Sequence, residues 1–310
     1  MAVTTRSYAG NRFYLELDKP SGWLFTAEGG QPSTDLITER LAGGYPSRKH
    51  VGIVKFDDIT VTCGTGMTEQ FYQWLQQSLR YEHQRRNGAV VSANYDYKEV
   101  ARQDFHQALI TEIGFPGLDA ASKDTAKFNI KFAVEWTEMK YSNGAQSIRA
   151  AGNIDPPKQK LWTIANFQVQ IDGLEQVCKR VTKVEAITIK QQVVENNIGE
   201  RLVYEKEPAQ IDFPNVVLTV PEADIEPWYK WHHDVVVKGK SGPSSEKGGH
   251  LEYKTANLQE TLFRLDFKNM GPIKFTPDKL ESANDKLRYV KVELYCEHMD
   301  FTYFPRSTYG

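Results

Sequence analysis

The chain has 310 residues, 40% of them hydrophobic and 25% charged, and a formal net charge of −2. This length suits about two domains of roughly 100–200 residues each, and the near-neutral charge argues against a nucleic-acid-binding protein, which carries a basic excess. The three cysteines, Cys63, Cys178 and Cys296, are too few and too widely spaced for a disulfide framework or a CxxC metal site. Because the sequence lacks an apolar run of about 18 residues, we expect a protein made in the cytosol that is neither secreted nor membrane-bound.

The first half of the chain predicts strands around one helix. Phe13–Asp18 alternates apolar and polar residues as a half-buried strand does. After residues 27–53, which are rich in glycine, serine, threonine and charge, a second strand is predicted over Val51–Thr62. An amphipathic helix follows, and the strand Lys127–Trp136 ends this half. The apolar positions of the helix are Met67, Phe71, Trp74, Leu75 and Leu79.

The second half predicts the same order of elements. Phe167–Asp172 alternates like the first segment, and Val184–Glu195 alternates strongly before the turn residues Asn196–Gly199. With a return strand over Glu200–Lys206, this segment predicts a protruding β-hairpin. A second amphipathic helix and a final strand over Tyr289–His298 complete this half.

The two halves also match residue by residue, at one constant spacing and without a gap around the helix. The matching pairs are Phe56 with Phe213, Thr62 with Thr219, Glu69 with Glu226, Tyr72 with Tyr229, and Trp74 with Trp231. A repeated strand, turn and helix indicates one supersecondary unit used twice. We expect a structural core common to both copies, made of Phe56, Ile59, Trp74, Phe213, Val216 and Trp231.

This repeat predicts two homologous domains, over residues 1–141 and 161–310. A later block, Phe105–Met139, matches Phe267–Phe301 and extends the repeat to the ends of both halves. Residues 142–160 between the halves are predicted to be a linker, because they contain glycine, asparagine, serine and a Pro-Pro pair that blocks both helix and central strand.

Specific residues in this order of elements resemble a known family. They are Lys55, Phe56, Ile59 and Thr62 before the first helix, Trp74 and Leu75 in it, Arg86, Asn87 and Gly88 after it, and Phe105, Leu118, Ala120, Ala121 and Ser122 in the last third of the first half. With these residues the first half resembles the tail tube protein family of long-tailed contractile phages and phage-like contractile injection systems. The second half departs from the pattern, since Pro214 and Asn215 replace the charged pair before the strand.

The resemblance implies a mainly β fold with two tandem tube-like β-barrel or sandwich domains, each with one flanking α-helix and a long protruding β-hairpin. It implies a structural protein that forms rings of a tail tube or injection-system inner tube, a conduit for DNA or effectors. Since family rings usually contain six single-domain subunits, three tandem chains would give a pseudo-hexameric ring. The hairpins would reach the next ring through Gly43, Gly44, Arg48, Asn196, Asn197 and Gly199.

The implied partners are further copies of the chain and the sheath, baseplate or tail-terminator proteins of the same particle. The implied location is a virion tail or injection-system particle, made and assembled in the bacterial cytoplasm. One polar strand face would line the lumen, but a shift of one residue in register exchanges the two faces, so the sequence leaves open which face is luminal. Candidate lumen-facing or interface residues are Lys127, Asn129, Lys131, Lys291 and Glu293.

Other functions remain open from the sequence. A trimeric baseplate hub or tube-initiator protein would also carry two tube-like domains, and a monomeric ligand-binding β-sandwich module would share the strand pattern. We expect neither an enzyme nor a cofactor, because the adjacent His232 and His233 would point about 100° apart on a helix, and Gly64-Thr65-Gly66 lacks the Walker lysine. The basic turn Arg85–Gly88 could bind phosphate, although the helix dipole alone favours a basic helix end.

Overall fold

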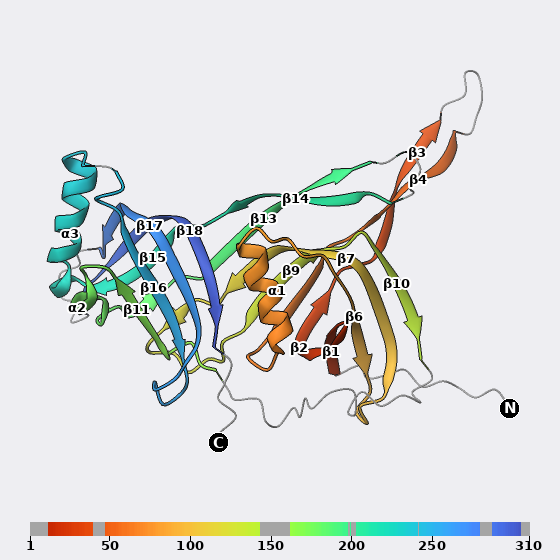
Figure 1. Cartoon of the computed structure of the whole chain (residues 1–310), viewed down its shortest axis with the longest axis horizontal. Coiled ribbons are helices and arrows are strands. Elements are labelled where there is room, and N and C mark those ends of the chain that lie inside the picture. The colour runs from red at the N-terminus through yellow and green to blue at the C-terminus, as the bar shows by residue number, and fades with distance from the viewer. Residues whose placement is uncertain are drawn as a thin grey trace.

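The fold is given by a computed structural model, which describes residues 12–39, 47–142, 162–197, 199, 203–240, 242–279 and 287–304. The chain is mainly β, as the sequence predicts (Figure 1). The first predicted strand is β1 (Arg12–Leu17), which leads through Asp18 into β2 (Lys19–Glu28). Asp18 has a left-handed backbone (φ 55°), a conformation that aspartate tolerates in tight turns.

Six strands of the first half close a barrel because β7 pairs with both ends of the sheet. The first part of β7 pairs with β6 and the last part with β9. The left-handed residue Gln107 (φ 55°) lies at the irregularity near the end of the first part. Alternate residues such as Ile59, Val61 and Phe132 point inward and are buried. The strand order around the barrel is β7–β6–β1–β2–β5–β9. The bounds of its other strands are β5 (Ile59–Cys63), β6 (Arg86–Ala93), β7 (Glu99–Phe115) and β9 (Phe128–Ala133).

The second half forms an open half-barrel. Strand β2 completes the first barrel, but the equivalent part of the second half contains only the short helix α2 (Glu175–Cys178) and the two-residue strand β12 (Lys183–Val184). The second sheet therefore does not close within the described residues. The strand order is β11–β16–β17–β18–β15–β12–β8. The remaining bounds are β8 (Leu118–Asp119), β11 (Phe167–Ile171), β15 (Val216–Pro221), β16 (Lys247–Lys254), β17 (Thr261–Pro277) and β18 (Tyr289–Tyr303).

Each half carries one of the two predicted amphipathic helices. Helix α1 (Glu69–Leu79) begins after Thr68 and lies between the first barrel and β18 of the second half (Figure 1). Helix α3 (Glu226–His232) follows a 3₁₀ turn (Glu222–Asp224) and packs on β17. It continues as one turn of π-helix (His233–Val237), an element that is rare and often found at functional sites.

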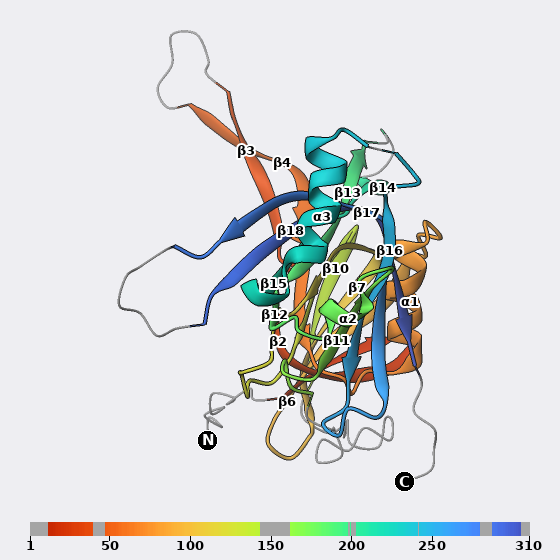
Figure 2. The same ribbon diagram turned by 90° about the vertical axis from the view of Figure 1, so that its left-hand side faces the viewer.

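Two long hairpins leave the body of the molecule (Figures 1 and 2). In the first, β3 (Pro32–Glu39) and β4 (Arg48–Phe56) pair only with each other and project away from the barrel. In the second, β13 (Ile187–Asn196) and β14 (Glu205–Asp212) pair together, and the start of β13 also pairs with the end of β7. The second hairpin is therefore held against the first half.

Several predicted strand boundaries need correction, two of them in the hairpins. The strand predicted over Val51–Thr62 is divided between β4 and β5, because Asp57 and Asp58 leave the ladder and the Asp57 N–H donates to the carbonyl of Gln31 (3.1 Å). The return strand of the second hairpin begins at Glu205, inside the segment predicted for it. Alternation predicted the second hairpin but not β3 of the first, and the breaks depend on contacts made elsewhere in the sheet.

The two halves share one hydrophobic core. The pairing Phe115 with Ile187 continues as Leu118 with Val184, so that β7 and β8 of the first half run beside β13 and β12 of the second. The ring of Phe128 also lies against aromatic rings of the second half, and its centroid is 5.0 Å from that of Phe263. A sheet ladder and an aromatic core therefore join the halves.

The second half repeats the pairing register of the first. Strands β7 and β17 begin and end at equivalent positions, and β18 corresponds to β9 together with β10 (Trp136–Tyr141). Gln103 pairs with Met139 in the first half, as Leu265 pairs with Phe301 in the second. The same irregularity interrupts both ladders, between Ile110 and Glu112 and between Pro272 and Lys274.

Candidate functional site

The residues expected to form a shared core occupy equivalent places in the two halves. Ile59, Trp74, Val216 and Trp231 are buried, while Phe56 and Phe213 are partly buried and pack against the same core. Each tryptophan makes the same hydrogen bond: the indole N–H of Trp74 donates to the carbonyl of Gln84, and that of Trp231 to the carbonyl of Ser245, both at 2.9 Å. Their role as the core of a duplicated domain stays a prediction.

Four of the five polar candidates lie on equivalent faces of the two sheets. Asn129 and Lys131 alternate with buried residues of β9, and Lys291 and Glu293 alternate in the same way on β18. Lys127 precedes β9, and its ammonium lies 4.8 Å above the ring of Phe25. The structure thus places Asn129, Lys131, Lys291 and Glu293 on the outward face of their strands, opposite the core.

This outward face carries charges of both signs that pair along the sheet. Lys291 contacts Glu185 (2.7 Å), and Lys183 contacts Asp119 across the strands that join the halves (2.6 Å). Because β7 and β8 lie beside β13 and β12, the face continues from the first sheet to the second. We call this surface of β5, β9, β7, β13, β12, β15 and β18 the polar wall.

The predicted hairpin residues lie at the ends of both ribbons where the structure describes them. Arg48 begins β4 and is exposed, Asn196 ends β13, and Asn197 follows it. A Cβ added at Gly199 would meet no atom within 4 Å. Gly43 and Gly44 lie outside the described residues. The first ribbon also exposes large apolar side chains, namely Leu36, Ile37 and Val51.

A buried lysine at the root of the two hairpins was not foreseen from the sequence. Lys206 of β14 is 7% exposed, and its ammonium lies 3.5 Å from a carboxylate oxygen of Asp58 and 3.4 Å from the carbonyl of Phe56. Asp58 also pairs with Lys131 of the polar wall (3.4 Å). A buried lysine needs such partners, so these contacts fix the second hairpin to the turn between β4 and β5.

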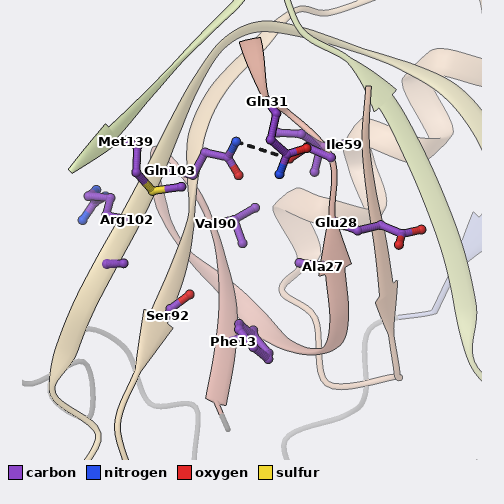
Figure 3. Close-up of a pocket in the computed structure, with 12 residues that line it drawn as sticks. Phe13, Ala27, Glu28, Gln31, Ile59, Val90, Ser92, Arg102, Gln103 and Met139 are labelled. Atoms are coloured by element: carbon purple, nitrogen blue, oxygen red, sulfur yellow. Dashed lines mark hydrogen bonds between the residues drawn. The ribbon is translucent and has the colours of Figure 1, made fainter. Parts of the chain in front are cut away.

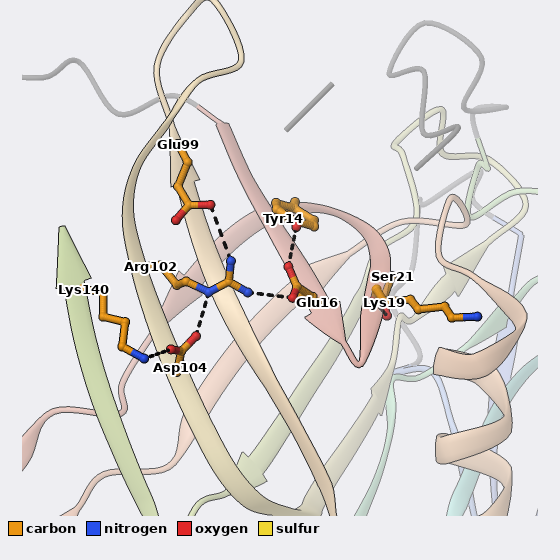
Figure 4. A network of polar contacts seen from close by, with 8 residues as sticks. All are labelled: Tyr14, Glu16, Lys19, Ser21, Glu99, Arg102, Asp104 and Lys140. Carbon is orange, nitrogen blue, oxygen red and sulfur yellow. Dashed lines mark hydrogen bonds and ion pairs between the residues drawn. The ribbon is translucent and has the colours of Figure 1, made fainter. Parts of the chain in front are cut away.

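A second polar network holds β10 against the barrel (Figure 4). The guanidinium of Arg102 donates to Glu16 of β1 (2.6 Å) and Asp104 (2.7 Å), and Lys140 of β10 donates to Asp104 (2.8 Å). Although burial raises the pKa of Asp104, the hydrogen bonds from Lys140 and Arg102 hold it below its ordinary value. Burial raises the pKa of the adjacent Glu99, against the charge of Arg102.

The basic turn is engaged in contacts between and within the halves. Arg80 pairs with Asp300 of β18 (3.0 Å), and Arg85 pairs with Glu207 of β14 (2.7 Å). Arg86 lies 3.9 Å from Asp18. Because each guanidinium faces a carboxylate, the turn is built to join the two halves, and this geometry gives no support to a phosphate site.

A pocket of about 110 Å³ opens at the end of the first barrel beside β10 (Figure 3). The amide of Gln103 donates to the carbonyl of Gly29 at its rim (3.3 Å). Gly29 and Gly30 are both left-handed (φ 95° and 77°), and a Cβ at Gly29 would lie 1.9 Å from the carbonyl oxygen of Asp58. The main lining residues are Phe13, Ile59, Val90, Ala101, Gln103 and Met139.

Within the described parts of the chain, no group of three or more histidine, cysteine, aspartate or glutamate residues could hold a metal ion. All three cysteines are free and buried, and burial raises the pKa of Cys178 and Cys296 to about 11. Among the helices that the structure describes, none is long and apolar enough to cross a membrane.

The barrel, the half-barrel and the ion-paired polar wall define a mainly β fold. Residues 9–138 match the model of the family described as T4-like virus tail tube protein gp19. Over these residues the chain is similar to a family of tail tube proteins. The resemblance of the first half is thereby confirmed.

Comparison with curated proteins gives no match, whereas several solved structures are similar to part of the chain. One is from the sheath-tube complex of the PVC extracellular contractile injection system in its extended state, with 21% identity and a TM-score of 0.40 over 45% of this chain and 95% of that chain. A second is from the PVC sheath/tube terminator, with 22% identity and a TM-score of 0.39 over 45% and 99% of the two chains. A third, from the tube-terminating cap of the anti-feeding prophage, has 15% identity and a TM-score of 0.37 over 51% and 99%.

Proposed function

We propose that this protein forms rings of a tail tube or an injection-system inner tube, with two tube-like domains in each chain. The observation that carries the proposal is the tail tube family match over residues 9–138, followed by a second set of strands that repeats its pairing register. Three chains would then supply six tube-like units to one pseudo-hexameric ring. The domains would cover residues 1–141 and 161–310, and residues 142–160 would link them.

Sheet edges support assembly from further copies of the same chain. The outer edges of β10 and β14 have no strand beside them within the described residues, and β17 extends past its pairing with β16. Unpaired edges promote association, and a closed ring covers them. The polar wall supports a conduit, because charges paired along its surface leave a hydrophilic face for DNA or effector cargo to pass.

Rings would stack through the first hairpin. Its exposed Leu36, Ile37 and Val51 suit burial against a neighbouring ring, with Arg48 beside them and with Asn196, Asn197 and Gly199 on the second hairpin. In the assembled particle we propose the sheath, baseplate or tail-terminator proteins as partners, and assembly in the bacterial cytoplasm before the particle is complete.

Cryo-electron microscopy of the purified protein tests this function. We expect rings or tubes with an open channel, three-fold symmetry and a pseudo-six-fold outline. Six chains per ring would refute the proposed stoichiometry, and monomers at every concentration would refute ring formation. A single trimer that never stacks would instead favour a baseplate hub or tube initiator, which would occur at only one level of a particle.

The hairpin has a matched test of its own. Leu36→Ser with Val51→Ser removes exposed apolar groups from the projecting ribbon, so rings should form but stack poorly. Leu258→Ser, on an exposed loop between β16 and β17 and away from both hairpins, is the control. Normal tubes from the double variant would contradict the stacking role of the first hairpin.

A further inference from the structure

The two helices occupy equivalent positions but differ in what covers them. Tyr72 of α1 corresponds to Tyr229 of α3 at the same spacing that relates Trp74 to Trp231. Tyr72 is 0% exposed because α1 lies between the two halves, whereas Tyr229 is 40% exposed. Val236, farther along the same helical segment, is also exposed. Within one chain, α3 therefore lacks the covering surface that α1 has.

The surface that covers Tyr72 belongs to β17 and β18. The ring of Tyr72 stacks on Tyr303 at 4.2 Å between centroids, and it also lies beside Phe263 (5.2 Å) and Phe301 (6.3 Å). At the end of the helix, the C-cap residue Arg80 pairs with the outward-facing Asp300. The contact combines an aromatic centre with an ion pair at its rim.

The counterpart of this surface in the first half is uncovered. The shared register places Ala101 where the second half has Phe263, Met139 where it has Phe301, and Tyr141 where it has Tyr303. Met139 is 49% exposed and Tyr141 is 84% exposed. Ala101 and Met139 line the pocket at the barrel end, where Met139 points into the hollow (Figure 3).

The ion pair also has a counterpart. Lys238 is the C-cap of the π-helical turn, as Arg80 is the C-cap of α1. The π turn holds one more residue than an α turn, which accounts for the extra position between Tyr229 and Lys238. Glu138 of β10 corresponds to Asp300, so the opposite charges are preserved. Both side chains are about half exposed, and among the described residues each pairs with a neighbour on its own element.

We infer that α3 of one chain packs against β10 of a second copy, with Tyr229 over the pocket beside Met139 and Lys238 facing Glu138. The inference rests on the proposed function, because it names the contact between neighbouring chains of the ring. Helix α3 and strand β10 lie on opposite sides of the molecule (Figure 1), so the contact is head-to-tail and can repeat around a ring. This contact between chains is equivalent to the contact that α1 makes with β17 and β18 within one chain.

Cross-linking of mixed single-cysteine variants tests the contact. Chains with Tyr229→Cys are mixed with chains carrying Tyr141→Cys, at a concentration well above that at which wild-type rings form, and are treated with a short thiol-to-thiol cross-linker; the three natural cysteines are buried. We expect a covalent dimer in the mixture but not from either variant alone. Leu258→Cys, on an exposed loop residue outside the contact, replaces Tyr141→Cys in the control mixture and should give no dimer.

A second measurement uses assembly. Tyr229→Ala should raise the protein concentration needed for ring formation by about tenfold or more, the effect expected of an aromatic residue at the centre of an interface, while its circular dichroism stays unchanged. If wild-type rings form but no cross-link appears between positions 229 and 141, the inference is wrong and the proposed function stands. If wild-type chains form no rings, the proposed function fails, and the cross-link still decides whether two copies meet through these surfaces.

Discussion

Replacing Tyr72 by alanine should destabilise the whole chain, because its ring joins the two halves. A buried aromatic side chain removes about 150–250 Å² from water, which at about 25 cal/mol per Å² corresponds to roughly 4–6 kcal/mol as an upper estimate. Measured costs for large aromatic-to-alanine changes in cores are about 3–5 kcal/mol, so we expect about 4 kcal/mol for Tyr72→Ala. Its contacts with Phe263, Phe301 and Tyr303 would all be lost.

The assay is thermal unfolding at a concentration where chains are unassembled, since assembly would add stability. An unfolding entropy of about 2.1 cal/mol/K per residue over 310 residues gives about 0.65 kcal/mol/K, so 4 kcal/mol lowers Tm by about 6 °C if the halves unfold together. Tyr229→Ala is the matched control, and its partly exposed ring should cost less than about 2 kcal/mol. Equal decreases in Tm for the two variants would refute the assignment of Tyr72 to the contact between halves.

Three further changes probe other parts of the structure. Burial lowers the pKa of His83 and His298, so the unfolded chain binds more protons than the folded chain. The free energy of unfolding should therefore fall as pH drops below about 6.5. Thermal unfolding between about pH 7.5 and 5 measures this, and His298→Gln should flatten the profile. Gly88→Ala should cost about 3 kcal/mol in urea unfolding, because its Cβ would lie 2.0 Å from a backbone oxygen of β1, and an unchanged midpoint would contradict that close approach. Asp58→Ala leaves the ammonium of Lys206 buried without its carboxylate and should cost about 3 kcal/mol, more than the change Lys206→Met measured in the same way.

Local pattern was enough to predict much of the fold. Alternation located β1, β9 and β18, and apolar spacing located α1 and α3, because these signals depend on residues close in sequence. The sequence did not predict β2, which begins directly after the left-handed Asp18. It also could not show that β7 pairs with β13, because that ladder forms between residues far apart in the chain and depends on the arrangement of whole sheets.

The positions of the candidate site residues could likewise be predicted only in part from the sequence. Period-two alternation correctly placed Asn129 and Lys131 on one face of β9, since neighbouring strand residues point to opposite sides. The buried Lys206 gave no such signal, because a lone lysine in an alternating strand is normally solvated. The Arg102 network was likewise hidden, since it joins three strands that only the closed barrel brings together.

Within the described residues, the second half has no full counterpart of β2, which bears on the order of assembly. The open half-barrel admits aromatic residues of the first half, among them Tyr72 and Phe128, and buries them completely. The first barrel is closed, so the equivalent surface at Met139 offers only a shallow pocket to Tyr229 of a neighbouring chain. The contact within a chain therefore buries more aromatic surface than the contact between chains, and burial of apolar surface is the main driving force of both. We expect the two halves to fold as one unit before chains join, which makes the whole chain the building block of the ring.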